Sequence, residues 1–171
     1  MAEAMTAEQA VTLYELLDAR GVRCWVMGGW GVDALLGRVT REHKDLDLLV
    51  HRADLATYAD IVRRGGFDRK LEWSENRPLE IDGVRCDSAF VDAHRDGREI
   101  DVHVVDVHHG EVVQFHDGPW PLPTDALSGR GTLAGRAVRC VSRAAQLAMH
   151  SCYDLPEKHR ADVRLLQPRL D

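Results

Sequence analysis

The strongest constraint on the fold is the alternation of acidic and apolar residues at positions 45–50, Asp-Leu-Asp-Leu-Leu-Val. In a β-strand, residues two apart face the same side, so Asp45 and Asp47 project together while the leucines after them face a core. Two adjacent carboxylates repel each other unless a cation lies between them. Because Mg²⁺ prefers hard oxygen ligands, the pair predicts a metal site. The alternative is a half-exposed strand with a solvated polar face.

A second strand, predicted at residues 98–105, supplies a third carboxylate. Glu99, Asp101 and His103 share one face of it, and apolar residues share the other. If this strand pairs beside residues 45–50, Asp101 completes an acidic triad. Two metal ions about 4 Å apart can then activate an attacking oxygen and stabilise a leaving one. His103 either holds Asp101 or the reacting group in place, or is an ordinary strand histidine.

Gly28-Gly29 lies between a predicted strand at residues 22–27 and a predicted helix at residues 30–36. Glycines let the backbone approach an anion, and the amides at a helix N-terminus donate hydrogen bonds to phosphate. The spacing matches neither a Walker A loop nor a dinucleotide-binding fingerprint. Trp30 is expected mainly to pack in the core, with substrate contact as the alternative.

A basic loop connects the glycine turn to the acidic pair. It contains Arg38, Arg41, His43 and Lys44. Such positive charge suits a triphosphate, although a solvated loop has the same composition. Its position between the turn and the carboxylates favours the phosphate interpretation.

The remaining pattern predicts one compact unit. A capping box at Thr6–Gln9 begins a helix that Gly21 ends. Further elements are expected at residues 53–64 (helix), 67–81 (two short strands), 84–92 (strand, in a hairpin with 98–105) and 112–115 (strand). We place a core at residues 1–116, and a loop with C-terminal helices packed on it at 117–171. Ser142 and Pro156 mark the helix starts.

Composition limits the classes of partner. The chain has 171 residues and a formal net charge of −6, which argues against sequence-independent binding to nucleic acid. The four cysteines form no C-x-x-C pair, and free thiols are expected, with Cys24 and Cys86 buried. Neither a signal peptide nor a run of roughly 20 apolar residues is present, so no membrane span is expected. A cytoplasmic location fits these features best.

The motifs resemble a known superfamily. Gly28-Gly29, Asp45-Leu46-Asp47 and Asp101 are similar to the nucleotidyltransferases that include DNA polymerase beta. The string GGWGVDALLGRVTREHKDLDLLV resembles small antibiotic nucleotidyltransferases, most of all lincosamide nucleotidyltransferases and next aminoglycoside 2''-nucleotidyltransferases. The segment CVSRAAQLAMHSCYDL resembles the lincosamide enzymes too. Over residues 66–98 and 106–135 the resemblance is weaker, and those regions are expected to contribute acceptor binding.

The resemblance implies an α/β (α+β) fold, with a mixed sheet flanked by helices and a short C-terminal helical part. It implies transfer of AMP from ATP to a hydroxyl of a lincosamide, with release of pyrophosphate, by a Mg²⁺-dependent homodimer. The implied roles are metal binding by Asp45, Asp47 and Asp101, general-base catalysis by Asp101, nucleotide binding by Gly28, Gly29, Arg41 and Lys158, and acceptor contact or support by His103, Trp30 and His43. Asp162 is expected to orient Lys158 from the next turn of its helix.

Three alternatives remain at this level. One is an aminoglycoside acceptor, for which an acidic pocket that includes Asp87, Asp92, Asp96 and Glu99 would suit the polycation. Another is a non-catalytic relative, such as a partner in a toxin–antitoxin pair, although such a protein is expected to lose a carboxylate. The third is modification of a protein or a tRNA end. A histidine–zinc site is weaker, because no convincing third ligand accompanies the histidines.

Overall fold

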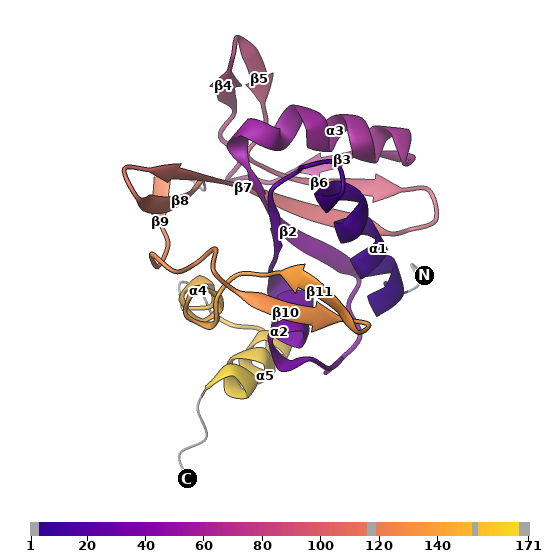
Figure 1. Ribbon diagram of the computed structural model, residues 1–171, viewed down its shortest axis with the longest axis vertical. Helices are drawn as coiled ribbons and strands as arrows, with labels where there is room; N and C mark the ends of the chain where they lie inside the picture. The colour runs from indigo at the N-terminus through magenta and orange to yellow at the C-terminus, as the bar shows by residue number, and fades with distance from the viewer. Residues whose placement is uncertain (1–3, 116–118, 152–153, 168–171) are drawn as a thin grey trace.

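A mixed β-sheet forms the centre of the computed structural model, which describes residues 4–115, 119–151 and 154–167 (Figure 1). Its seven strands run in the order β1-β2-β7-β6-β3, with β8 paired to β7 and β9 paired to β8. They are β1 (Cys24–Val26), β2 (Asp45–His51), β3 (Phe67–Glu72), β6 (Ala89–His94), β7 (Glu99–His108), β8 (Glu111–Phe115) and β9 (Pro119–Pro121).

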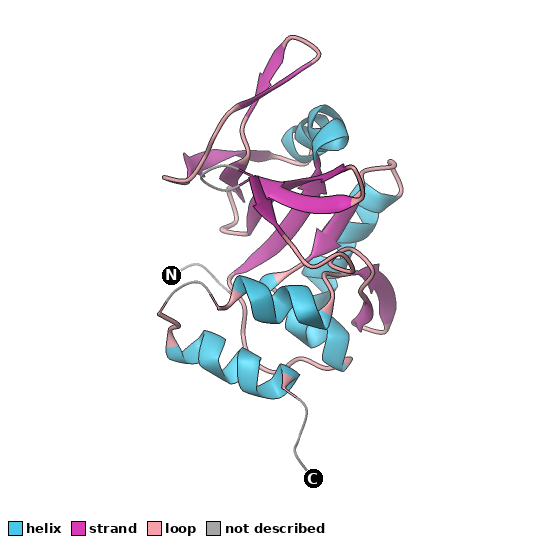
Figure 2. Cartoon of the chain, turned by 90° about the vertical axis from the view of Figure 1, so that its left-hand side faces the viewer, coloured by secondary structure: helices cyan, strands magenta, loops and turns pink. Residues whose placement is uncertain are grey.

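The helices cover the two faces of the sheet. They are α1 (Ala7–Asp18), α2 (Gly28–Leu36), α3 (Leu55–Arg64, after a short 3₁₀ turn at Arg52–Asp54), α4 (Arg143–Met149) and α5 (Glu157–Leu166). One face, with Leu46 and Leu48, is buried in the same core as apolar residues of α1 and α3. On the other face, Leu49 packs in a smaller core that includes Ala145 of α4. Figure 2 shows helices gathered at the end of the molecule from which the C-terminus leaves.

The register of β2 and β7 brings the two acidic strands together. These strands are parallel, and Asp47 is paired with Asp101. β7 also pairs antiparallel with β6, as the predicted hairpin requires. The α/β fold with a mixed sheet flanked by helices is therefore confirmed.

Local signals account for most element ends. The Thr6–Gln9 capping box is formed in both directions, and the Ser142 side chain caps α4. Gly37 ends α2 with a φ of +66°, which glycine adopts without strain. Helix α2 begins at Gly28 rather than at Trp30, with Met27 as its N-cap. The expected strand at residues 84–92 is divided between β6 and a separate hairpin of β4 (Leu79–Ile81) and β5 (Val84–Cys86).

A further hairpin was not predicted. Strands β10 (Arg130–Leu133) and β11 (Arg136–Arg139) pair within residues 117–171, where only a loop and helices were expected. Only Leu133 and Val138 in them are buried apolar residues, so the alternation is too short to recognise in the sequence. The hairpin is positioned by Leu133 and Val138 in the main core and by close packing of Gly131 against Ala34 of α2. Ion pairs also join it to α1, from Arg136 to Glu8 and Glu15 and from Arg139 to Asp18.

The C-terminal part is attached directly to the core. Strand β9 joins the central sheet, and Cys140 forms a parallel bridge with Val26. The expected boundary between residues 116 and 117 lies outside the described residues, as does Cys152, so that division stays a prediction. Cys24 is buried as expected, whereas Cys86 is only partly buried because it lies on the projecting β4–β5 hairpin. Within the described residues, no helix is both long and apolar enough to span a membrane.

The cap of α1 gives a test of the fold. Thr6→Ala removes the side-chain acceptor of the Gln9 amide, and we expect the free energy of unfolding to fall by about 1 kcal/mol. Thr12→Ala, at an exposed position inside the same helix, should leave stability equal or slightly higher. Urea denaturation of the two variants measures the difference. Equal stabilities would contradict the role of the capping box.

Candidate active site

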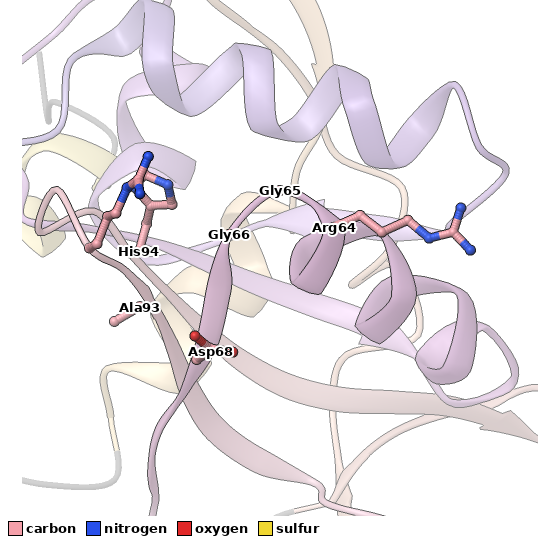
Figure 3. Close-up of a pocket in the computed structure, with 7 residues that line it drawn as sticks. Arg64, Gly65, Gly66, Asp68, Ala93 and His94 are labelled. Atoms are coloured by element: carbon pink, nitrogen blue, oxygen red, sulfur yellow. The ribbon is translucent and has the colours of Figure 1, made fainter.

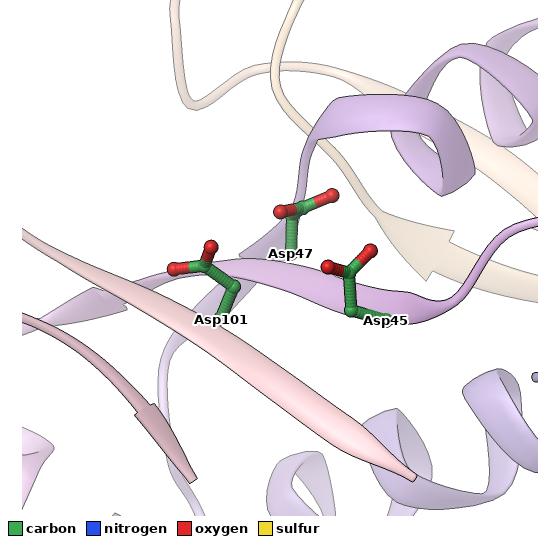
Figure 4. A group of neighbouring side chains, drawn as sticks. All are labelled: Asp45, Asp47 and Asp101. Atoms are coloured by element: carbon green, nitrogen blue, oxygen red, sulfur yellow. The ribbon is translucent and has the colours of Figure 1, made fainter. Parts of the chain in front are cut away.

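Three carboxylates meet at the centre of the sheet. Asp45 and Asp47 project from β2 and Asp101 from β7, and one oxygen of each lies within 4.8 Å of the others (Figure 4). Among the described residues, this is the one group of acidic, histidine or cysteine side chains with metal-binding geometry, so the histidine–zinc alternative has no support there. Oxygen ligands at this spacing fit a hard divalent cation such as Mg²⁺.

The crowding of these groups changes their titration. Burial raises the pKa of Asp47 well above its usual value, and repulsion from Asp45 and Asp101 raises it further. Lys158 and Arg41 oppose this increase in the pKa of Asp47. Burial also raises the pKa of Asp101 to about 6, although a hydrogen bond from Trp73 acts in the opposite direction. The folded protein thus holds excess negative charge that a bound cation would relieve.

The glycine turn packs tightly against the acidic strand. A Cβ atom at Gly28 would lie 2.1 Å from Oδ2 of Asp47, and Gly28 itself has a φ of +59°. At Gly29, a Cβ atom would lie 2.2 Å from Nδ1 of His43. The glycines are therefore required by contacts within the protein, apart from any role in phosphate binding.

His43 belongs to a buried polar network. Its Nε2 lies 2.7 Å from Oδ2 of Asp33, and Asp33 also accepts hydrogen bonds from the amide and hydroxyl of Thr40. The His43 ring lies 4.3 Å from the ring of Trp30, centre to centre. Trp30 is 2% exposed and part of the main core, so the structure places it behind the site, in support of His43.

The basic loop is attached to the last helix. Arg41 donates two hydrogen bonds to Asp162 of α5, from Nη2 at 2.8 Å and from Nε at 3.2 Å. Asp162 is 1% exposed, and through these two hydrogen bonds its carboxylate orients Arg41. The sequence had suggested Lys158 as the residue that Asp162 orients. The hydrogen bond from Arg41 to this carboxylate raises the pKa of the guanidinium. Lys158 is exposed and faces the carboxylates from the same helix, close enough to lower the pKa of Asp47.

These groups surround one cavity of about 750 Å³. All the site residues predicted from the sequence line it except Trp30: Gly28, Gly29, Arg41, His43, Asp45, Asp47, Asp101, His103 and Lys158. Nε2 of His103 lies 3.5 Å from Oδ1 of Asp101, as the shared face of β7 predicts. Helix α4 closes the cavity through Gln146, whose amide donates a 2.9 Å hydrogen bond to the carbonyl of Gly28.

Several other lining residues were assigned no functional role from the sequence. These are Trp73 and Glu75 after β3, Gln114 on β8, and Met149, His150 and His159 near the C-terminus. Burial and the neighbouring His150 and Lys158 lower the pKa of His159. No motif or periodicity in the sequence singles out Trp73, because β3 does not alternate regularly between buried and exposed residues.

A second hollow of about 630 Å³ lies where α3 ends and β3 begins (Figure 3). It is lined by Arg64, Gly65, Gly66, Asp68, Ala93, His94 and Arg95. None of the predicted site residues reaches it. The carboxylate cavity is therefore the candidate active site.

A family comparison agrees with this geometry. Residues 9–166 match the model of the family described as aminoglycoside-2''-adenylyltransferase. The chain belongs to this family. It is thus a nucleotidyltransferase, and the resemblance seen in its motifs is confirmed.

Two groups of relatives stand out among family members. The chain is 26% identical over 166 residues to a lincosamide resistance protein of Staphylococcus haemolyticus, covering 95% of each chain. It is 30% identical over 175 residues to a 2''-aminoglycoside nucleotidyltransferase of Escherichia coli, covering 94% of this chain and 87% of that protein.

Solved structures show the same fold. The lincomycin-bound lincosamide adenylyltransferase LnuA superposes with a TM-score of 0.78 at 24% identity, covering 96% of this chain and 98% of that chain. The aminoglycoside enzyme ANT(2'')-Ia, in complex with adenylyl-2''-tobramycin, superposes with a TM-score of 0.72 at 24% identity, covering 94% and 86%.

Repulsion within the triad predicts that removing one charge stabilises the metal-free protein. In EDTA at pH 8, we expect Asp47→Asn to raise the free energy of unfolding by more than about 0.5 kcal/mol, the size of an ordinary surface effect. A carboxyl group whose pKa is raised by folding costs stability as the pH rises above its unfolded value, so the gain should shrink towards pH 4. Urea denaturation at several pH values measures this.

The matched control is Asp68→Asn, which removes one charge at an exposed position of β3. It should change stability by less than about 0.5 kcal/mol. If Asp47→Asn destabilises the metal-free protein at pH 8, strong repulsion between the three carboxylates is contradicted.

Proposed function

We propose that this protein transfers AMP from ATP to a hydroxyl group of a small antibiotic, a lincosamide in the first place, and releases pyrophosphate. The observation that carries the proposal is the convergence of Asp45, Asp47 and Asp101 in one cavity with the glycine turn and two basic residues. A degenerate, non-catalytic relative would be expected to lose one of these carboxylates. The presence of all three carboxylates therefore favours an enzyme.

The acidic triad suits Mg²⁺, held by Asp45, Asp47 and Asp101. When bound, the metal supplies charge neutralisation for the phosphates and for the leaving pyrophosphate. The raised pKa values of Asp47 and Asp101 support this assignment, because both groups gain from a neighbouring cation. The resemblance to polymerase-like enzymes suggests two metal ions.

The other steps of the proposed reaction are assigned to side chains and backbone amides of the protein. Lys158, Arg41 and the amides at Gly28 and Gly29 bind the triphosphate. Asp101 accepts the proton of the acceptor hydroxyl, and the oxygen attacks the α-phosphorus as the bond to pyrophosphate breaks. Most of the barrier reduction comes from positioning and charge neutralisation, as in phosphoryl transfer generally.

The charge around the cavity favours a lincosamide over an aminoglycoside. The four acidic residues suggested for a polycation pocket do not line the cavity. Each is instead in an ion pair within the protein: Asp87 and Asp92 with Arg69, Asp96 with Arg98, and Glu99 with Lys70. Outside the triad, Glu42 and Glu75 are the acidic residues that line it, and Arg41, Lys44 and Lys158 offset them.

The direct test is a pyrophosphate-release assay with ATP, Mg²⁺ and a panel of lincosamides and aminoglycosides. We expect release with lincosamides and little with aminoglycosides. Release with aminoglycosides alone would overturn the acceptor assignment and leave the transfer reaction in place. If no small acceptor supports release, a protein or RNA acceptor, or a binding role, becomes the better explanation.

The same assay tests the general base. Asp101→Asn keeps the shape of the side chain but cannot accept the proton, so we expect turnover to fall by at least about 100-fold. Circular dichroism should show an unchanged fold. Asp60→Asn, on the exposed face of α3, is the matched control and should keep full turnover. Near-normal turnover by Asp101→Asn would exclude it as the base.

Metal binding gives a separate prediction. Mg²⁺ should raise the melting temperature of the protein at pH 8 and raise it less at pH 5. Protons compete for the metal ligands at the lower pH, because the pKa of Asp101 is about 6. Differential scanning fluorimetry with and without EDTA measures the shift. In Asp45→Asn the shift should largely disappear, and an unchanged shift in that variant would place the metal elsewhere.

We also infer from the family resemblance that the working form is a homodimer in which the partner closes the acceptor side of the cavity. The open cavity beside Trp73 and Glu75 is compatible with such a wall. Multi-angle light scattering of the purified protein distinguishes a dimer from a monomer.

A further inference from the structure

Trp73 is the one large apolar side chain with substantial exposure that lines the carboxylate cavity, among the residues the structure describes. It is 36% exposed. The other large apolar residues of comparable exposure lie elsewhere: Leu16, Val39, Val84, Val107 and Leu165. A single exposed apolar residue is ordinary on a protein surface, but this indole lines a cavity beside the acidic triad, and that position suggests a binding role.

The indole of Trp73 is hydrogen-bonded to Asp101, the proposed general base. Nε1 of Trp73 donates a 2.9 Å hydrogen bond to Oδ1 of Asp101, and Nε2 of His103 lies 3.5 Å from the same oxygen. No hydrogen bond to Oδ2 of Asp101 is found within the described part of the chain. The two contacts at Oδ1 therefore orient the carboxylate of Asp101, and Oδ2 is left to accept a hydrogen bond from a reacting hydroxyl.

The backbone around Trp73 holds the indole in place. The Trp73 amide donates to the carbonyl of Ala89 on β6, and its carbonyl accepts from the amide of Asn76. The side chain of Asn76 in turn accepts hydrogen bonds from the amides of Ser88 and Ala89. This turn is thus attached to the sheet by several hydrogen bonds, which fixes the position from which the indole reaches Asp101.

We propose that Trp73 is both a wall of the acceptor site and a positioning residue for Asp101. The inference rests on the proposed transfer to a small-molecule acceptor and names the part of the acceptor that binds here: a sugar ring. One face of a pyranose ring is largely C–H and packs on a flat aromatic surface, while its hydroxyl groups point outward along the edge. With the sugar on the indole, an edge hydroxyl lies beside the carboxylate that the same indole orients.

The two roles can be separated by substitution. Trp73→Phe keeps an aromatic surface and removes the N–H donor. We expect its kcat to fall about tenfold, with KM for the acceptor within about threefold of wild type. Trp73→Leu also removes the aromatic surface, and we expect KM for the acceptor to rise about tenfold in addition. KM for ATP should stay unchanged in both variants.

Acceptor binding is measured independently of turnover. Isothermal titration of lincomycin into protein held in EDTA without nucleotide should give equal affinity for wild type and Trp73→Phe, and about tenfold weaker affinity for Trp73→Leu. Tobramycin replaces lincomycin if the pyrophosphate assay identifies an aminoglycoside as the acceptor. Thermal melting confirms that each variant is folded. If Trp73→Leu does not fold, Trp73→Phe alone is sufficient to test the effect on kcat.

The results distinguish this inference from the proposed function. An active wild type with both variants unchanged in kcat and KM would overturn the role of Trp73 and leave the transfer reaction standing. An equal rise of KM for ATP and acceptor would show a purely structural role and overturn it as well. A wild type that modifies no small acceptor contradicts both proposals.

Discussion

Parallel pairing of β2 with β7 is the interaction on which the rest of the structure depends. The register sets Asp47 beside Asp101 and places Asp45 one pleat away on the same face. Such close carboxylates repel each other, so burial elsewhere must hold the strands together. The opposite faces of these strands provide it, because Leu46, Leu48 and Val102 are fully buried in the main core. The free energy gained by burying apolar residues on one face of the sheet thus offsets the repulsion between the carboxylates on the other face.

The wall of the cavity around the glycine turn is built from close backbone packing. Gly28 and Gly29 allow Asp47 and His43 to approach α2 at distances that any side chain would prevent. Asp33 and Trp30 then support His43 from behind, and Gln146 holds the carbonyl of Gly28. The contact of Gln146 joins segments 118 residues apart, so the turn is held from the C-terminal part of the chain as well as from its own neighbours.

The periodicity of the sequence predicted much of the sheet around the acidic triad. The alternation in Asp45-Leu46-Asp47 and around Asp101 predicted both strands and their shared face, and capping residues predicted the starts of α1 and α4. The neighbours of each strand could not be deduced from alternation alone, because pairing depends on contacts between distant residues. For the same reason, the hydrogen bonds from Arg41 to Asp162 and the β10–β11 hairpin were not predicted. Trp73 was not singled out, since its hydrogen bond to Asp101 depends on the order of β3, β6 and β7 in the sheet.

The ion pair between Arg41 and Asp162 has a consequence for the autonomy of the N-terminal part. The loop that carries Arg41 and His43 is anchored at one side by the backbone of Met5 and at the other by α5. A chain cut after residue 116 would retain the triad but lose the carboxylate that orients Arg41, together with Lys158 and Gln146. The residues that line the candidate active site therefore come from nearly the whole length of the chain. Shortening the chain at either end would remove contacts on which the geometry of the cavity depends.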